Sequence, residues 1–143
     1  MNEPSSIDRL LSHPAVAVPA YFSVGILMLI ICLYCFERVT KYECWQEIRK
    51  GNVAVAMATG GKIFGICNIF RFSIQSSDSI YESMLWAGGG FLLLLAAYLL
   101  FEFVTPVFRI DEEIGKDNRA VGLISLLLSV SLSYIIGAAV TLD

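Results

Sequence analysis

The chain contains four long apolar stretches, each of about the length that crosses a lipid bilayer. They cover residues 18–36, 53–72, 84–104 and 121–140, which is more than half of the 143 residues. The hydrocarbon core of a bilayer offers no water to backbone N–H and C=O groups, so a single span has to be helical. The sequence therefore predicts an all-α integral membrane protein whose main partner is the lipid bilayer.

The composition agrees with a chain that has little mass outside the membrane. Hydrophobic residues make up 57% of the chain and charged residues 16%, with a mean hydropathy of +0.70. Soluble domains have about 45–50% apolar and about 25% charged residues. These values exclude a nucleic-acid-binding module and an ordinary soluble enzyme.

Basic residues indicate the orientation of the spans, because short cytoplasmic loops are enriched in Lys and Arg. The segments after the first and third stretches hold seven of them: Arg38, Lys41, Arg49, Lys50, Arg109, Lys116 and Arg119. On the other side lies Arg9 alone, in a segment without the basic start of a cleaved signal peptide. We expect both termini to lie outside the cytoplasm and the first stretch to be a retained helix.

Two parts of the chain resemble each other. Residues 36–40, Phe-Glu-Arg-Val-Thr, match residues 101–105, Phe-Glu-Phe-Val-Thr, at a shift of 65. Residues 47–55 match residues 113–121 at a shift of 66, with Glu, Ile, Lys, Asn, Ala and Val in common. The matches fall at the same helix end and in the same loop, so they predict an internal duplication.

The duplication divides the chain into a first repeat, residues 18–72, and a second repeat, residues 84–143. An external N-terminal segment, residues 1–17, precedes them, and an external loop, residues 73–83, joins them. Each repeat holds two spans and enters the membrane the same way round, so the repeats are parallel. The predicted architecture is a four-helix membrane bundle built from two parallel two-helix repeats.

One motif resembles a known family. Residues 47–56, Glu-Ile-Arg-Lys-Gly-Asn-Val-Ala-Val-Ala, are followed by Gly60, Gly61 and Gly65. This pattern is similar to the bacterial inner-membrane family catalogued as domain of unknown function 350, whose members carry two such repeats at about this length. The second repeat departs from the pattern with Asp117-Asn118-Arg119-Ala120-Val121-Gly122. The resemblance implies a bacterial inner-membrane location, in which case both termini would be periplasmic. It also implies a link to envelope or membrane stress, with stress-related partner proteins. It implies no biochemical activity.

Lys62 is the charge that the bilayer tolerates least. It lies nine residues into the second stretch, about 14 Å from its start, and a lysine at the bilayer centre costs roughly 2.5–3.5 kcal/mol on insertion scales. The repeat counterpart is Leu128, so the repeat fold does not require the charge. Either the ammonium is satisfied by carbonyls or by Thr59, or it lines a pore or contacts an anion.

Other polar residues extend this second interpretation. Ser125, Ser129 and Ser133 lie along one face of the last stretch, and Glu37 and Glu102 occupy equivalent helix ends. The serines are candidates for a polar path, and paired carboxylates can form a cation entry. The simpler alternative for the glutamates is a place at the cytoplasmic interface.

Small residues form stripes that permit close helix packing. The stripes consist of Ala54, Ala58, Gly61 and Gly65 in the second stretch, and of Gly122 and Gly137 together with the serines in the fourth. Asn52 and Asn118 precede these stretches, where Asn is a favoured N-cap.

Further residues mark the membrane edges. Trp45 lies in an amphipathic segment, residues 39–48, predicted to continue the first helix along the interface. Arg71 is expected to reach the headgroups near the outer surface. Pro106 is expected to end or kink the third helix.

Catalytic and metal-binding patterns are weak. Cys32 and Cys35 lie within the first stretch without a histidine nearby, and His13 is the only histidine. We expect no catalytic residues, metal or cofactor, and no nucleic-acid partner. The predicted protein is non-enzymatic and forms homo-oligomers, with a structural or envelope-stress-associated role. The alternative is an oligomeric ion channel or small-solute transporter that uses Lys62, the serines and the two glutamates.

Overall fold

The computed structural model describes residues 6–105, 107 and 109–142, which form helices and no strand. Four of the helices are long and apolar enough to cross a membrane. The all-α membrane fold is thus confirmed. In chain order the helices are α1 (Ser6–Leu11), α2 (Pro14–Val39), α3 (Cys44–Arg49), α4 (Val53–Ser76), α5 (Ile80–Val104), α6 (Ile110–Gly115) and α7 (Arg119–Val140).

The long helices extend beyond the apolar stretches because polar residues at the membrane edge cap them. The side chain of His13 accepts a hydrogen bond from the Ala15 backbone N–H at the start of α2. The hydroxyl of Ser79 accepts one from Glu82 at the start of α5. The predicted loop at residues 73–83 therefore contains only residues 77–79 between the two helices. Residues 1–5 of the N-terminal segment and Pro106 lie outside the described residues.

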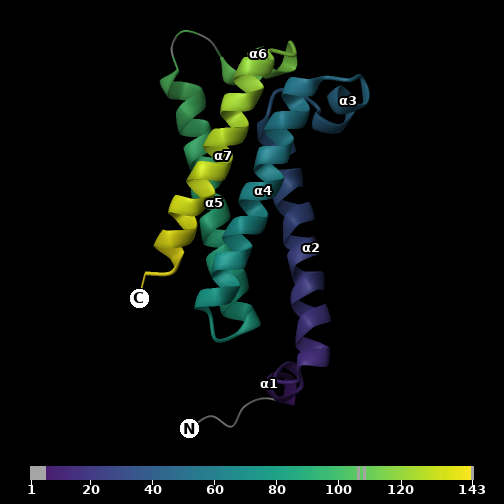
Figure 1. Cartoon of the computed structure of the whole chain (residues 1–143), viewed down its shortest axis with the longest axis vertical. Helices are drawn as coiled ribbons and strands as arrows, with labels where there is room; N and C mark the ends of the chain where they lie inside the picture. The colour runs from purple at the N-terminus through teal and green to yellow at the C-terminus, as the bar shows by residue number, and fades with distance from the viewer. Residues whose placement is uncertain (1–5, 106, 108, 143) are drawn as a thin grey trace.

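The central element of the bundle is α4. In its most apolar stretch of 18 residues, 56% is buried inside the bundle, whereas only 6% of the corresponding stretch of α2 is buried. The helix α7 packs along α4, α5 packs against both, and α2 lies on the other side of α4 (Figure 1). The bundle is therefore uneven, with α4 enclosed by protein and α2 largely exposed.

Glycines allow α4 and α7 to approach closely. A Cβ placed on Gly61 would lie 2.7 Å from the Leu126 Cα, and one on Gly122 would lie 2.7 Å from the Ala54 Cα. Real side chains do not come this close to backbone, so only glycine fits these two positions without separating the helices. This close contact makes α4 and α7 a rigid pair on which the other elements pack.

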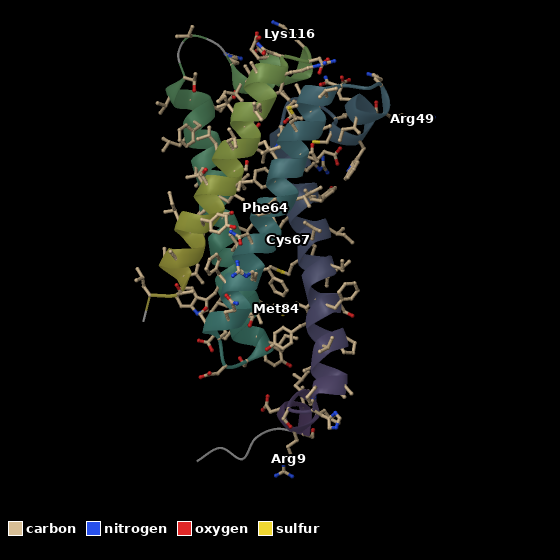
Figure 2. The ribbon with its side chains drawn as sticks, viewed as in Figure 1. Arg9, Arg49, Phe64, Cys67, Met84 and Lys116 are labelled. Atoms are coloured by element: carbon tan, nitrogen blue, oxygen red, sulfur yellow. The ribbon has the colours of Figure 1, made fainter. Side chains whose placement is uncertain are left out.

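The short helices α3 and α6 lie at one end of the bundle, which we call the α3–α6 end; α1 lies at the opposite end (Figure 1). Arg49 and Lys116 mark the α3–α6 end and Arg9 the other (Figure 2). The predicted helix over residues 39–48 is interrupted, because α2 stops at Val39 and α3 begins only at Cys44. The intervening turn carries Tyr42 into a buried cluster with Cys44 and residues of α4 and α6.

Candidate functional site

Lys62 is enclosed by aromatic side chains. It is 1% exposed, and its Nζ donates a hydrogen bond of 3.3 Å to the Tyr42 hydroxyl. The ring centroids of Tyr98, Phe36 and Tyr42 lie 4.7, 5.1 and 5.5 Å from Nζ. An ammonium over an aromatic face is attracted by the negative face of the ring. Three such rings and one hydroxyl therefore take the place of water around the charge.

The aromatic cage is connected to a buried carboxylate on α6. The Tyr98 hydroxyl donates to Oδ1 of Asp111, and the Lys41 backbone N–H donates to Oδ2 over 3.1 Å. Asp111 is only 4% exposed. A buried charge is costly unless it is paired and hydrogen-bonded, and the two donors meet this need. The carboxylate thus holds the α2–α3 turn, α5 and α6 together.

Tyr42 occupies the middle of this network. Burial is the main cause that raises the pKa of its hydroxyl well above the ordinary value, and the Asp111 charge adds to the rise. The neighbouring Tyr98 hydroxyl acts in the opposite direction. The hydroxyl therefore stays protonated at physiological pH, and its oxygen accepts the hydrogen bond that Lys62 donates.

A polar pocket adjoins the network at the α3–α6 end. Its volume is about 710 Å³, and its lining includes Tyr98, Glu102, Lys41, Arg109 and Asp111. Oε2 of Glu102 accepts a hydrogen bond of 3.2 Å from the Asp111 backbone N–H. Its Oε1 is buried and has no hydrogen-bond partner among the described residues. The pocket thus brings three carboxylates, those of Glu102, Asp111 and Glu112, and two cations next to Tyr98, whose ring faces Lys62.

Glu37 and Glu102 have different surroundings despite their matching positions in the sequence. Glu102 belongs to the polar network, whereas Glu37 is half-buried near the end of α2 and does not line the pocket. Thr59 is buried one turn from Lys62, and its hydroxyl has no partner among the described residues. Lys62 is therefore held by Tyr42 and the rings rather than by Thr59.

The serine stripe of α7 is buried where α7 meets α4. Ser125, Ser129 and Ser133 are all buried, and a Cβ on Gly65 would meet the Ser129 carbonyl oxygen at 3.2 Å. Ser133 also accepts a hydrogen bond of 3.0 Å from Asn68. A Cβ on Gly137 would overlap the ring of Phe72. Within one chain Ser133 and Gly137 belong to this packed contact, whereas Ser125 and Ser129 also line a cavity of about 530 Å³.

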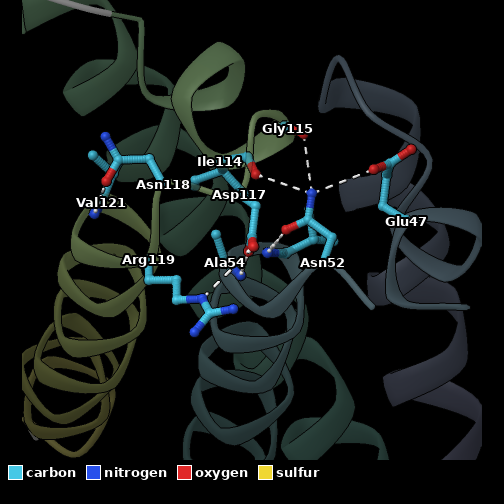
Figure 3. Close-up of polar contacts among 10 residues, drawn as sticks. Glu47, Asn52, Ala54, Ile114, Gly115, Asp117, Asn118, Arg119 and Val121 are labelled. Carbon is cyan, nitrogen blue, oxygen red and sulfur yellow. Dashed lines mark hydrogen bonds and ion pairs between the residues drawn. The ribbon is translucent and has the colours of Figure 1, made fainter. Parts of the chain in front are cut away.

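A second polar cluster lies at the turns before α4 and α7 (Figure 3). Asn52 is the N-cap of α4: its Oδ1 accepts from Val55 N over 3.0 Å, and its Nδ2 donates to the Gly115 carbonyl over 3.0 Å. Asp117 in turn accepts a hydrogen bond of 2.9 Å from the Ala54 N–H at the start of α4. Each turn therefore helps to cap or hold the other.

The turns share their local geometry at positions that match in the sequence. Asn118 caps α7 as Asn52 caps α4, and its Nδ2 contacts Glu113 as that of Asn52 contacts Glu47. Gly51 and Asp117 both have positive φ, +88° and +61°. A residue with positive φ closes a helix through the Schellman pattern of hydrogen bonds. This pattern is present in both turns.

Two further predicted residues lie on the surface. Arg71 is exposed, and it contacts Asn68 Oδ1 at 3.5 Å and the ring of Phe72. Trp45, on α3, is 56% exposed. Both surroundings suit residues that meet lipid or its headgroups.

The sequence reasoning did not identify Phe36, Tyr98 or Asp111 as neighbours of Lys62, and it placed Tyr42 only on the membrane-edge helix. One signal was present for Tyr98. Its counterpart in the first repeat is Leu33, just as the counterpart of Lys62 is Leu128. A polar side chain that replaces leucine at a matching position marks a difference between the two predicted repeats.

The structure defines a four-span helical membrane protein with a lysine buried behind a tyrosine–aspartate network. The chain belongs to the family described as Domain of Unknown Function (DUF350), whose model matches residues 10–140. It is 52% identical over 125 residues to the UPF0719 transmembrane protein YshE of Bacillus subtilis (strain 168), covering 87% of this chain and 93% of that protein. It is 27% identical over 108 residues to the UPF0719 inner membrane protein YjfL of Escherichia coli (strain K12), covering 76% and 80%. No solved structure matches the chain.

Proposed function

We propose that the chain is a non-enzymatic membrane protein that self-assembles and has a structural or envelope-stress-associated role. The observation that carries this proposal is the uneven burial of the spans, since only 6% of the most apolar window of α2 is buried. The exposed side chains of α2 include Phe22, Ile26, Leu27, Ile30 and Ile31. Within the described residues, the elements between the spans are short helices and turns.

The buried polar groups support the same proposal. Lys62 is enclosed by rings, and the serines of α7 lie in the contact with α4, so both serve the packing of one chain. The Lys62 ammonium and the Ser133 hydroxyl are already hydrogen-bonded inside the bundle, so these two groups do not require water along its axis. The surface left for interaction is apolar and includes exposed side chains of α2, α5 and α7, of which α2 is the least buried span.

Native mass measurement of the protein in lipid nanodiscs tests self-assembly. We expect dimers or larger species for the unaltered protein and a shift to monomers for a Phe22→Ala, Ile26→Ala variant of α2. The matched control is Leu123→Ala, Leu127→Ala, which removes comparable exposed side chains from α7. A monomer at every protein-to-lipid ratio would contradict self-assembly, and equal effects of the two variants would remove α2 from the interface.

Passage of ions or small solutes is the second candidate function. The observation in its favour is the network that connects Lys62 to the pocket beside Glu102 and Asp111. A path through an assembly would use Lys62, Glu37 or Glu102, and the serine stripe. Flux of ions into liposomes is the measurement, with Lys62→Leu as the variant. Equal flux for the two proteins would remove Lys62 from this mechanism.

We further propose that the protein lies in the bacterial inner membrane with both termini on the periplasmic side. The name of the Escherichia coli relative and the resemblance to an inner-membrane family support the location. The basic residues support the orientation, because Arg49 and Lys116 lie at the α3–α6 end and Arg9 at the other (Figure 2). The α3–α6 end would then face the cytoplasm.

A further inference from the structure

We propose that the cavity between α5 and α7 binds one diacyl phospholipid, with an acyl chain inside the cavity and the ester carbonyls at the hydroxyls of Ser125 and Ser129. The cavity has a volume of about 530 Å³, and ligand cavities commonly measure about 300–1,000 Å³. The inference goes beyond the proposed function, because it names a molecule that a single chain binds whether or not the chains assemble.

The cavity forms because α5 and α7 pack together near one end only. Away from the α3–α6 end, a Cβ on Gly90 of α5 would lie 3.2 Å from Ile136 Cγ2 of α7. At the α3–α6 end, α7 instead stays close to α4, where a Cβ on Gly122 would lie 2.7 Å from the Ala54 Cα. The cavity lies between α5 and α7 at this end, where Figure 1 shows the two helices apart.

The lining of the cavity is mostly apolar and connects it to the bilayer. Phe36 and Leu94 line it and are buried, whereas Phe101 of α5 and Ile124 of α7 line it and are exposed. Both exposed residues belong to helices that are long and apolar enough to span a membrane. An acyl chain can therefore enter sideways from the lipid and contact apolar side chains throughout.

Two hydroxyls in this lining lack a hydrogen-bond partner. Ser125 and Ser129 are 6% and 8% exposed, and no described residue forms a hydrogen bond with either hydroxyl. The other polar side chains of the lining, those of Tyr98, Thr105 and Asn118, all form hydrogen bonds within the chain. Buried hydroxyls normally have a partner, and a ligand with acceptor oxygens would supply one to each serine.

The spacing and depth of the serines fit the ester groups of a phospholipid. Residues four apart on a helix have Cβ atoms about 5–6 Å apart on one face, and the two ester carbonyls of a diacyl lipid are carried by adjacent glycerol carbons. Ser125 lies six residues after Arg119, or about 9 Å along α7. The headgroup layer is roughly 5–8 Å thick. With Arg119 among the headgroups, Ser125 lies where the acyl chains begin.

Basic residues lie beside the cavity at the level of the lipid phosphate. Arg119 lies between two residues that line the cavity, and Arg109 directly precedes a third. Arg119 contacts Asp117 through Nε, and Arg109 contacts Glu112 through one terminal nitrogen, so each guanidinium group keeps further donors. Exposed ion pairs contribute little to stability, and arginine binds phosphate through charge-assisted hydrogen bonds. The charge of the arginines therefore complements the phosphate of the proposed ligand.

Native mass measurement of the full chain tests the site. The protein is released from nanodiscs that contain equal amounts of one pure phosphatidylglycerol with ester-linked chains and its ether-linked analogue, which has the same headgroup and chains but no carbonyls. We expect one retained lipid for each chain. The diester should be retained at least about tenfold better than the diether, the factor that corresponds to two ordinary hydrogen bonds.

Two variants with matched controls locate the lipid. Ser125→Ala, Ser129→Ala should retain both lipids equally, whereas Ser133→Ala should keep the preference, because Ser133 contacts Asn68 and does not line the cavity. Leu128→Trp fills the cavity and should lose the lipid. Leu127→Trp should retain it, since Leu127 is exposed and lies outside the lining.

Three outcomes would overturn the proposal. The first is equal retention of diester and diether by the unaltered protein. The second is a preference that persists in the double serine variant, because the ester carbonyls would then bind elsewhere. The third is displacement of the diester by an isoprenoid quinone added in equal amount, because a ring with two carbonyls would then be the better ligand of the hydroxyls.

Discussion

At the scale of single residues, Lys62 and Asp111 show how opposite charges can be buried without direct contact. The ammonium is surrounded by rings, the carboxylate by a hydroxyl and a backbone N–H, and the two tyrosines lie between them. A removed partner in such a network leaves the remaining polar groups buried and unsatisfied. The stability of this region should therefore depend on each member.

Asp111→Asn should lower the free energy of unfolding by about 1–3 kcal/mol, because Tyr98 and the Lys41 N–H lose a charged acceptor. Unfolding in mixed detergent micelles, followed by circular dichroism, is the measurement. Asp78→Asn is the matched control, since Asp78 is exposed in the turn between α4 and α5. Equal stability of the two variants would show that the Asp111 carboxylate does not hold the network together.

Residues of the cage also show which signals a sequence carries. Lys62 is conspicuous because a charge in an apolar stretch is costly. Tyr98 is less conspicuous but differs from its repeat counterpart, Leu33. Asp111 gives no such signal, because an acidic residue at the start of a short amphipathic helix is ordinarily solvated. Its burial follows only from the way α6 folds onto the α2–α3 turn.

At the scale of elements, the pairing of α4 with α7 depends on glycine at the points of closest approach. The spacing of small residues predicted packing stripes on both helices. Such a stripe does not specify the helix that packs against it, because a surface of small residues can meet a helix of the same chain or of another copy. The structure places the stripes of α4 and α7 against each other.

Gly61→Ala should destabilise the bundle by about 1–3 kcal/mol, the usual cost of overpacking, because its Cβ would collide with the backbone of α7. Gly60→Ala is a closely matched control, since a Cβ there meets nothing within 4 Å. Thermal unfolding in detergent compares the two. An unchanged midpoint for Gly61→Ala would mean that α4 and α7 are farther apart than the structure indicates.

The paired turns should respond to acid. Hydrogen bonds from Lys50 and Asn52 lower the pKa of Glu47, and one from Asn118 lowers the pKa of Glu113. A lowered folded-state pKa means that the stabilisation is complete above the ordinary glutamate value of 4.5. It is lost as the pH falls below that value and the carboxylates become protonated.

Amide hydrogen exchange at the starts of α4 and α7 measures this response. We expect the protection of the Val55 and Val121 amides to decrease as the pH falls below 4.5, after correction for intrinsic exchange. In a Glu47→Gln, Glu113→Gln variant this decrease should be absent. A pH response that persists in the double variant would assign it to other carboxylates.

At the scale of the whole molecule, the bundle has a charged end and an exposed first span. The α3–α6 end carries the charged turns and the polar pocket, whereas α2 has its apolar side chains mostly exposed. A membrane protein can expose such a helix to lipid or to another copy, and these alternatives have different consequences for function. Topology and assembly are therefore the measurements at this scale.

Fusions of alkaline phosphatase, which is active only outside the cytoplasm, test the topology. A fusion after the C-terminal residue should be active, because the basic residues place the α3–α6 end in the cytoplasm. A fusion after Lys50 should be inactive. The reversed pattern would place the α3–α6 end in the periplasm.

The sequence by itself determined the number of spans, their helical structure, the capped turns and the unusual charge at Lys62. These depend on local properties, because span length, backbone hydrogen bonding and the spacing of Asn and Gly act over a few residues. Only the tertiary structure decided that the serines face α4 and that Tyr42, Tyr98 and Asp111 surround or connect to Lys62. Those contacts join residues far apart in the chain, and their register is set by which glycines allow the helices to approach.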